Sequence, residues 1–308
     1  MRILVTGASG LLGLNLSLEA AKGHTVFGVV NTHSLKGKAF TVLQANLLAP
    51  GEIERVFEAA QPDWVIHCAA LANLEVCERN PALAQKLNAE LPGMIAEASR
   101  ETGARLAHIS TDAVFDGQKG NYTEMDEPNP LSIYASTKLI GERTVVDVYP
   151  QAIIARVNLF GWSISGKRSL AEFFFNNLQA GNSVMGFTDV FFSPLLANDL
   201  GRVLLSMLAE NLHGLYHIGS RDNLSKYDFG VKIAGKFGFD SALIHPSSFA
   251  DSNLEASRSP NLSLCVEKLI LNLRASTPNL STDLDHFYEL YQQGYPQKLK
   301  QMLVVGDL

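Results

Sequence analysis

Short apolar runs alternate with amphipathic helical patterns along the first half of this 308-residue chain. The runs are strand-like because they are short and rich in β-branched side chains, whereas the helical patterns place apolar residues three or four positions apart. Strands are predicted at residues 2–6, 24–30, 40–43, 64–68, 105–109 and 152–156. The first predicted helix ends near residue 21, and further helices are predicted at residues 52–60, 82–101 and 132–148. This alternation predicts an α/β fold with a Rossmann-type, doubly wound parallel sheet.

The pattern loosens after residue 156. Helices are predicted at residues 170–178, 197–209, 226–237, 266–273 and 283–303, and a strand at 215–218. We therefore expect residues 1–156 to form a dinucleotide-binding Rossmann domain, with a returning segment near 195–219. Residues 157–308 are expected to form mostly a smaller substrate-binding α/β region.

A glycine-rich turn follows the first predicted strand and leads directly into an apolar helix. Its residues are Gly7, Ala8, Ser9, Gly10, Leu11, Leu12 and Gly13. Glycines at such a turn permit a tight bend, close approach of the backbone to a pyrophosphate, and close packing of helix on strand. The amides at the start of the helix then face the phosphates. Although the spacing differs from Gly-x-Gly-x-x-Gly, its place between strand and helix predicts a dinucleotide site.

The second predicted strand ends at Asn31, where a cofactor with a free ribose 2′-hydroxyl usually meets an acidic residue. The sequence has no Asp or Glu there, whereas His33, Lys36 and Lys38 lie close by. This composition favours NADP(H), with NAD(H) as the alternative. An ordinary solvated basic loop would have the same composition.

Tyr134 and Lys138 stand four residues apart in a predicted helix, so both side chains lie on one helical face. An ammonium beside a phenol favours the phenolate and lowers a pKa that begins near ~10. A tyrosine tuned in this way can donate a proton to a carbonyl that receives a hydride. A Tyr and a Lys exposed on a helix without any catalytic role would have the same spacing. The glycine turn upstream favours the catalytic interpretation of this pair.

Charge and composition exclude several classes of function. The net charge is −6, and Lys and Arg form no long run, which argues against a nucleic-acid partner. No stretch is long and apolar enough to predict a membrane span, and the first residues predict a strand in place of a leader. The three cysteines, Cys68, Cys77 and Cys265, lack metal-ligand spacing, so we expect free thiols, no metal site and a cytoplasmic protein.

These features together resemble the extended short-chain dehydrogenase/reductase family, and within it most closely the dTDP-4-dehydrorhamnose reductases. The most specific segment is Ser110 to Gly117, Ser-Thr-Asp-x-Val-Phe-Asp-Gly. The likeness is also carried by residues 6–13, 67–70, Asn88, 134–138, Arg156, 193–194, 199–200, 216–218 and 257–260.

The resemblance implies a catalytic set of Thr111, Tyr134 and Lys138. Thr111 would hydrogen-bond the substrate carbonyl, Tyr134 would donate the proton, and Lys138 would hold the nicotinamide ribose and lower the pKa of the tyrosine. The cofactor would also contact residues of the glycine turn together with Asn31, Asn46, Leu47, Ala69, Ala70, Asn88 and Ser110. The substrate would contact Asp112, Asn158, Trp162 and Arg258. Lys167 is a further candidate for a diphosphate contact, and core or surface roles stay open for Trp162 and Lys167.

The implied activity is NAD(P)H-dependent reduction of a nucleotide-linked 4-keto sugar. Departures from the reductase pattern at Ala72, Ala113 and residues 156–161 leave the sugar undetermined. Dehydration is disfavoured because Ala113 stands where dehydratases have a second carboxylate. A nucleotide-sugar 4-epimerase and a regulatory NADP-binding subunit resembling that of methionine adenosyltransferase remain alternatives. Phe173, Phe174 and Phe175 are expected to pack in the core and between subunits, which leaves a homodimer open.

Overall fold

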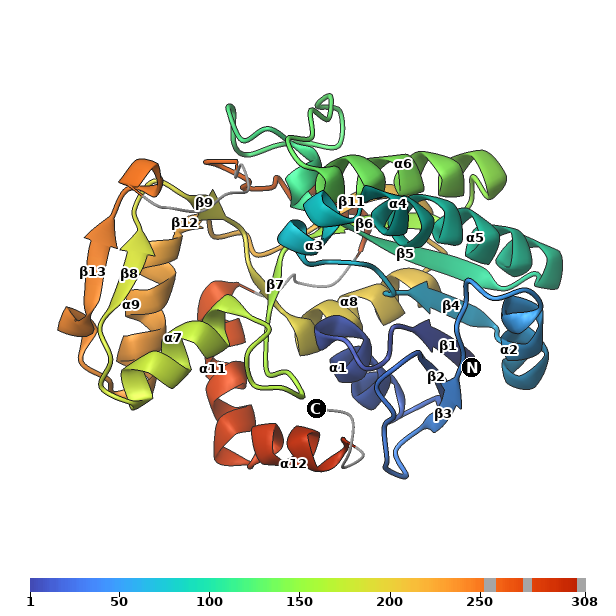
Figure 1. The fold of residues 1–308 in the computed structure, drawn as a ribbon, viewed down its shortest axis with the longest axis horizontal. Helices are drawn as coiled ribbons and strands as arrows, with labels where there is room; N and C mark the ends of the chain where they lie inside the picture. The colour runs from blue at the N-terminus through green and yellow to red at the C-terminus, as the bar shows by residue number, and fades with distance from the viewer. Residues whose placement is uncertain (252–258, 274–278, 304–308) are drawn as a thin grey trace.

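A parallel sheet of seven strands forms the centre of the part of the chain that the computed structural model describes, residues 1–251, 259–273 and 279–303 (Figure 1). The strand order is β11-β6-β5-β4-β1-β2-β3. The strands are β1 Arg2–Thr6, β2 Thr25–Val30, β3 Thr41–Gln44, β4 Trp64–His67, β5 Arg105–Thr111, β6 Ile153–Val157 and β11 Gly214–Ile218. The predicted α/β fold with a Rossmann-type sheet is therefore confirmed.

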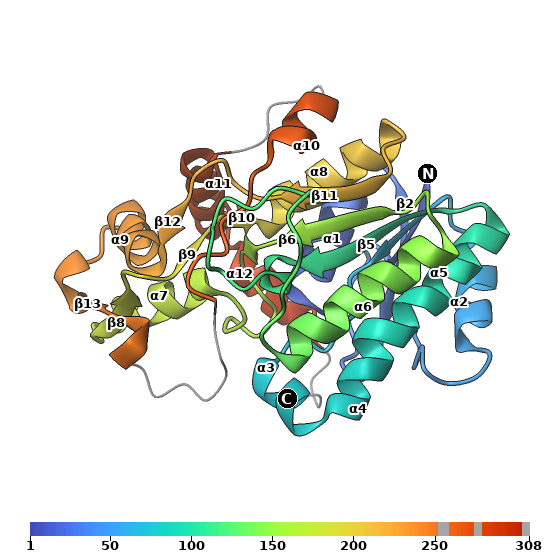
Figure 2. The same cartoon turned by 90° about the horizontal axis from the view of Figure 1, so that it is seen from above.

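Helices cover both faces of this sheet (Figures 1 and 2). One face carries α1 Leu11–Ala20 and α8 Ala197–Ala209, and the other carries α2 Glu52–Ala60, α5 Leu91–Thr102 and α6 Ile133–Val148. In α2 the buried residues are Ile53, Val56, Phe57 and Ala60. Their spacing puts a single apolar stripe against the sheet, which is why its bounds could be predicted from the sequence.

The helix predicted over residues 82–101 is interrupted. The structure has a short α4 Pro81–Ala84, then a π-helical segment Gln85–Glu90, and then α5. A further short helix, α3 Leu74–Arg79, was not predicted and begins where the Asn73 side chain accepts a hydrogen bond from the Val76 amide. π-helical turns are rare and occur frequently at functional sites.

The C-terminal part is smaller and lies beside the sheet (Figure 1). Its helices are α7 Leu170–Gln179, α9 Lys226–Phe237, α10 Glu267–Asn272, α11 Leu280–Gln292 and α12 Tyr295–Gln301. Its paired strands are β7 Leu159–Phe160 with β10 Leu195–Leu196, β8 Val184–Phe187 with β13 Ile244–Ser247, and β9 Phe191–Phe192 with β12 Leu224–Ser225. Short 3₁₀ turns span Asp112–Val114, Ser241–Leu243 and Phe249–Asp251. The helix predicted over 283–303 is two helices, because Gly294 adopts a φ of 70° between them.

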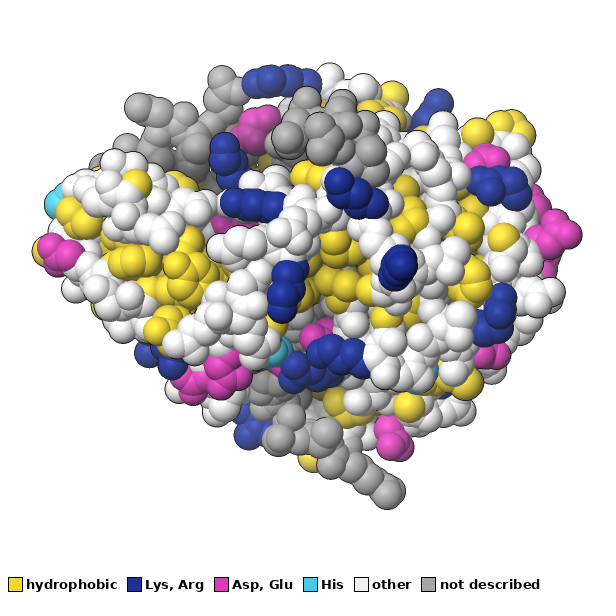
Figure 3. Space-filling view, turned by 90° about the horizontal axis from the view of Figure 1, so that it is seen from below, with side chains coloured by type: hydrophobic (Ala, Val, Ile, Leu, Met, Phe, Trp, Pro, Cys, Tyr) yellow, Lys and Arg dark blue, Asp and Glu magenta, His cyan; other side chains and the backbone are white. Residues whose placement is uncertain are grey.

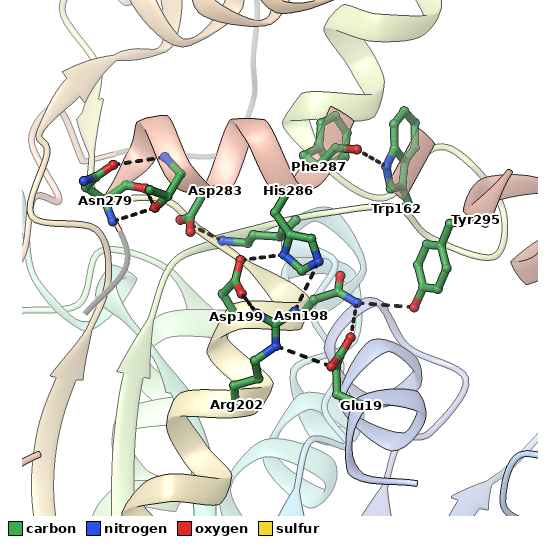
Figure 4. Close-up of polar contacts among 12 residues, drawn as sticks. Glu19, Trp162, Asn198, Asp199, Arg202, Asn279, Asp283, His286, Phe287 and Tyr295 are labelled. Atoms are coloured by element: carbon green, nitrogen blue, oxygen red, sulfur yellow. Dashed lines mark hydrogen bonds and ion pairs between the residues drawn. The ribbon is translucent and has the colours of Figure 1, made fainter. Parts of the chain in front are cut away.

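A polar cluster joins α11 to α1 and α8 (Figure 4). Asp199 accepts hydrogen bonds from Arg202 at 2.7 Å and from His286 at 2.9 Å. Arg202 also reaches Glu19 at 3.4 Å. Next to this cluster Asp283 is fully buried, and burial first, then the charge of Asp199, raise its pKa to about 8. The C-terminal helices are therefore fastened to the sheet region by groups whose charge depends on pH.

We expect Asp283→Asn to raise the free energy of unfolding at pH 8 by about 1–3 kcal/mol. Asp283 holds its proton in the folded protein up to about pH 8 but releases it near its ordinary pKa of ~4 when unfolded. Wild-type stability should therefore fall as the pH rises between these values, whereas Asn mimics the protonated acid at every pH. Urea denaturation at pH 5 and pH 8 measures this, and an equal difference between the two proteins at both pH values would contradict it.

Candidate active site

Two adjoining cavities lie at the carboxyl ends of the central strands. The larger, of about 810 Å³, is lined by residues 10–13, 68, 70–73, 109–112, 134, 138, 157–159, 167 and 168. The smaller, of about 240 Å³, is lined by residues 7, 9, 10, 29–33, 45–48, 68–70, 87, 91 and 168. Gly10, Cys68, Ala70 and Arg168 line both cavities. Because ligands of doubly wound sheets bind beyond the carboxyl ends of the strands, the pair of cavities is the candidate active site.

The glycine turn forms the wall where the two cavities meet. Gly7 has a φ of 68°, and a side chain there would meet the backbone of Ala69 at 2.8 Å. A Cβ on Gly13 would come within 2.2 Å of the Gly7 carbonyl oxygen. Helix α1 begins at Leu11, and no side chain caps it at Gly10. The first amides of this helix are therefore open to a phosphate, as a dinucleotide pyrophosphate requires.

The residues predicted to contact the cofactor fall into two groups. Asn31, Asn46, Leu47, Ala69 and Ala70 line the smaller cavity, together with Gly7 and Ser9. Leu11, Leu12, Gly13, Ser110, Tyr134 and Lys138 line the larger one.

Asn88 lines neither cavity and so differs from the expectation of a direct cofactor contact. Its side chain is fully buried, accepts a hydrogen bond from the Leu71 amide at 2.8 Å and donates to the Leu71 carbonyl at 3.0 Å. The amide therefore holds the loop after β4, and that loop forms the wall of the larger cavity.

Thr111 and Tyr134 are brought together by β5 and α6. Thr111 ends the strand and accepts a hydrogen bond from the Ala113 amide at 3.1 Å, while Ser132 caps α6 through the Ala135 amide. Burial raises the pKa of Tyr134 to about 12, and a hydrogen bond with Thr111 partly opposes this shift. The phenol therefore carries its proton at neutral pH, as a proton donor must.

Lys138 lies one turn after Tyr134, and its ammonium is bonded to residues of β5. Nζ donates to the Ile109 carbonyl at 2.6 Å and lies 3.3 Å from Nε2 of His108. Burial lowers the pKa of Lys138 to about 8. The expected lowering of the tyrosine's pKa by Lys138 is therefore not seen, because a backbone carbonyl holds the ammonium and burial controls the phenol.

Asp112 and Asn158 pair across the ends of β5 and β6. The Asn158 side-chain amide donates to the Asp112 carboxylate at 2.6 Å. Burial raises the pKa of Asp112 to about 6, although hydrogen bonds from Asn158 and Thr111 oppose the shift. Both residues line the larger cavity, where they present polar groups to a ligand.

A buried ion pair lies beneath the site. Glu142 of α6 accepts hydrogen bonds from Arg156 of β6 at 3.0 and 2.8 Å. The Ser110 hydroxyl also donates to Glu142, at 2.5 Å, so this hydroxyl is engaged within the protein. The pair fixes α6 against β5 and β6 and thereby positions Tyr134.

Trp162 does not reach the site, which corrects the expectation of a substrate contact. Its side chain is 3% exposed, its ring stacks on Phe287 at 4.1 Å, and its indole nitrogen donates to the Phe287 carbonyl (Figure 4). The reason is local packing, since Phe175 also meets the indole edge-on at 5.0 Å. Arg258, which was also expected to contact the substrate, lies outside the described residues.

Arg168 is a site residue that the sequence reasoning missed. It lines both cavities, and its guanidinium donates to the Ser9 carbonyl of the glycine turn at 3.4 Å. The available signal was the Lys167-Arg168 pair in the loop after β7. Lys and Arg side chains lie around a hollow on one face of the molecule despite the acidic net charge (Figure 3).

The described ranges hold neither a metal-binding cluster nor a membrane-spanning helix. No group of three or more His, Cys, Asp or Glu is arranged there to hold a metal ion. No helix in that part of the chain is long and apolar enough to cross a membrane.

Comparison with known proteins places this arrangement in context. Residues 1–293 match the family model described as the RmlD substrate binding domain. The chain is 34% identical to the probable low-salt glycan biosynthesis reductase Agl14 of Haloferax volcanii, over 92% of this chain and 96% of that one. It is 32% identical to methionine adenosyltransferase 2 subunit beta of Danio rerio, over 90% of this chain and 87% of that one. A crystal structure of a hypothetical dTDP-4-dehydrorhamnose reductase from Sulfolobus tokodaii matches with a TM-score of 0.81 at 30% identity. The match covers 92% of this chain and 98% of that one.

Proposed function

The chain belongs to the RmlD substrate binding domain family, and on that premise we propose that it is an NAD(P)H-dependent reductase of a nucleotide-linked 4-keto sugar. One observation carries the proposal most directly. Thr111 and Tyr134 line one cavity, which adjoins the glycine turn, so a carbonyl group and a dinucleotide can occupy one site. The reductase of Haloferax volcanii, similar over nearly its whole length, supports the same class of reaction.

In this proposal each residue has a defined task. A dinucleotide held in the two cavities would supply the hydride for the carbonyl carbon and be oxidised by that transfer. Thr111 donates a hydrogen bond to the carbonyl oxygen, and Tyr134 transfers its proton to that oxygen as negative charge develops. Lys138 would hold the hydroxyls of the nicotinamide ribose, with its ammonium released from the Ile109 carbonyl. Asp112 and Asn158 bind sugar hydroxyls, because they present polar groups to the same cavity.

The regulatory alternative rests on a specific relative. Methionine adenosyltransferase 2 subunit beta is 32% identical over 90% of this chain, and its name describes a subunit of another enzyme. An intact Thr111, Tyr134 and Lys138 favours an enzyme. A 4-epimerase would use the same three residues, so it differs from a reductase only in the fate of the hydride.

A screen of nucleotide-linked 4-keto sugars tests the proposed activity. The protein is mixed with each sugar and NADPH, and loss of the reduced nicotinamide absorbance is followed. We expect turnover with at least one sugar, and a product in which the ketone has become an alcohol. Binding of NADPH without turnover of any sugar would favour the regulatory alternative.

We also expect NADP(H) to bind at least as tightly as NAD(H). Among the described residues that line the smaller cavity there is no Asp or Glu, whereas His33 lines it at the end of β2. A 2′-phosphate therefore meets no carboxylate, and a 2′-hydroxyl lacks its usual acceptor. Isothermal titration with both cofactors measures the difference. A tenfold preference for NAD(H), about 1.4 kcal/mol, would refute the expectation.

A further inference from the structure

Arg168 occupies a distinctive position between the two cavities of the site. It belongs to the loop between β7 and α7, in the second half of the chain, yet it donates to the Ser9 carbonyl in the glycine turn. Among the described lining residues it is the one Lys or Arg that both cavities share. Lys167, its neighbour, lines the larger cavity alone.

A buried carboxylate builds the loop that presents Arg168. Glu172 is fully buried and accepts hydrogen bonds from the amides of Ser163, at 2.6 Å, and of Arg168, at 2.8 Å. The Ser163 hydroxyl donates to it as well, at 2.8 Å, and the Ser169 amide at 3.2 Å. The backbone of Arg168 is therefore fixed, while its side chain is exposed and reaches the glycine turn at Ser9.

A pyrophosphate bound at the glycine turn would be stabilised by a positively charged side chain beside Gly10. A dinucleotide that spans both cavities must place its pyrophosphate where they meet, beside Gly10. The amides at the start of α1 supply hydrogen-bond donors and a partial positive charge there, but no full charge. A guanidinium offers a planar fork of donors that matches phosphate oxygens.

We propose that Arg168 binds the pyrophosphate of the dinucleotide cofactor from the side opposite the glycine turn. This inference rests on the proposed function, because it presumes a dinucleotide in the two cavities. On binding, the guanidinium exchanges the Ser9 carbonyl for phosphate oxygens. The loop that carries it leads directly into α7, so the cofactor is held jointly by the sheet region and the C-terminal part.

Arg168→Gln tests the proposal, because glutamine removes the charge but keeps a hydrogen-bond donor. We expect binding of NADPH, and of ADP-ribose, to weaken about 10-fold or more, in the range of a lost charge-assisted hydrogen bond. The salt dependence of binding should also become shallower, since one ionic contact is lost. Arg168→Lys should recover part of the affinity. Arg143→Gln, which removes an exposed charge outside both cavities, controls for net charge and should leave binding within about twofold.

A titration with dTDP distinguishes the two possible sources of the diphosphate. If Arg168→Gln weakens dTDP binding and leaves NADPH and ADP-ribose unchanged, the guanidinium serves the substrate and the proposal is overturned. Unchanged affinity for all three ligands in a folded variant overturns it too. Failure of the wild-type protein to bind either NADPH or NADH would instead refute the proposed function itself.

Discussion

Tyr134→Phe is expected to lower turnover by at least ~10²-fold, the usual loss when a positioned proton donor is removed. The ring stays, so the packing of α6 against β5 is preserved, and only the phenol hydroxyl, the assigned proton donor, is lost. Affinity for the dinucleotide should change little, because the nicotinamide ribose is assigned to Lys138. Steady-state kinetics and a cofactor titration on the same preparation measure both quantities.

Thr111→Val provides a matched comparison for this variant. It preserves the shape of the side chain but removes the hydroxyl, which donates to Asp112 at 3.1 Å in this structure. Turnover should fall here as well, since the substrate carbonyl loses the hydrogen-bond donor assigned to Thr111. Near-normal turnover of folded Tyr134→Phe would show that another group donates the proton.

Arg156→Met is expected to reduce the free energy of unfolding by about 3–5 kcal/mol, the range for breaking a buried ion pair. Both partners are nearly inaccessible, with side-chain exposures of 4% and 6%. Removal of the guanidinium leaves the Glu142 carboxylate buried with the Ser110 hydroxyl as its remaining hydrogen-bond donor. Urea denaturation monitored by circular dichroism gives the value.

Arg55→Met is the control for this loss, because Arg55 forms a comparable ion pair with Glu52 at 2.8 Å on the surface. Exposed pairs contribute about 0.2–1 kcal/mol, so the control should be nearly neutral. The double variant Arg156→Met/Glu142→Leu should regain part of the lost stability, since neither member of the ion pair is then left buried without the other. Equal effects of Arg156→Met and Arg55→Met would contradict the assigned role of burial.

The elements of the sheet could be predicted because their signals are local. The apolar stripe of α2 and the glycine turn at Gly7 to Gly13 depend on residues close together in sequence. The π-helical segment around Asn88 could not be predicted in this way. Its buried amide bonds the backbone of Leu71, seventeen positions earlier, and that contact exists only once the loop after β4 is folded.

Local spacing in the sequence indicates which candidate site residues share an element, but it does not indicate their interactions. Tyr134 and Lys138 share a helical face, as their spacing requires. The Lys138 ammonium nevertheless donates its hydrogen bond to the Ile109 carbonyl of β5. Trp162 sits in an aromatic cluster with Phe287, more than a hundred residues later, so its burial left no local signal. Arg168 was missed for the same reason, because its partner Ser9 lies 159 positions earlier in the sequence.

Transfer of deuterium from the cofactor to the sugar tests the central claim most directly. NADPH carrying deuterium at the transferable position is incubated with the protein and a 4-keto sugar nucleotide, and the product is analysed by mass spectrometry and NMR. The proposed reductase predicts one deuterium on the former carbonyl carbon for each cofactor oxidised. A sugar that contains no deuterium, although the protein binds NADPH, would contradict the account and leave regulation or epimerisation in its place.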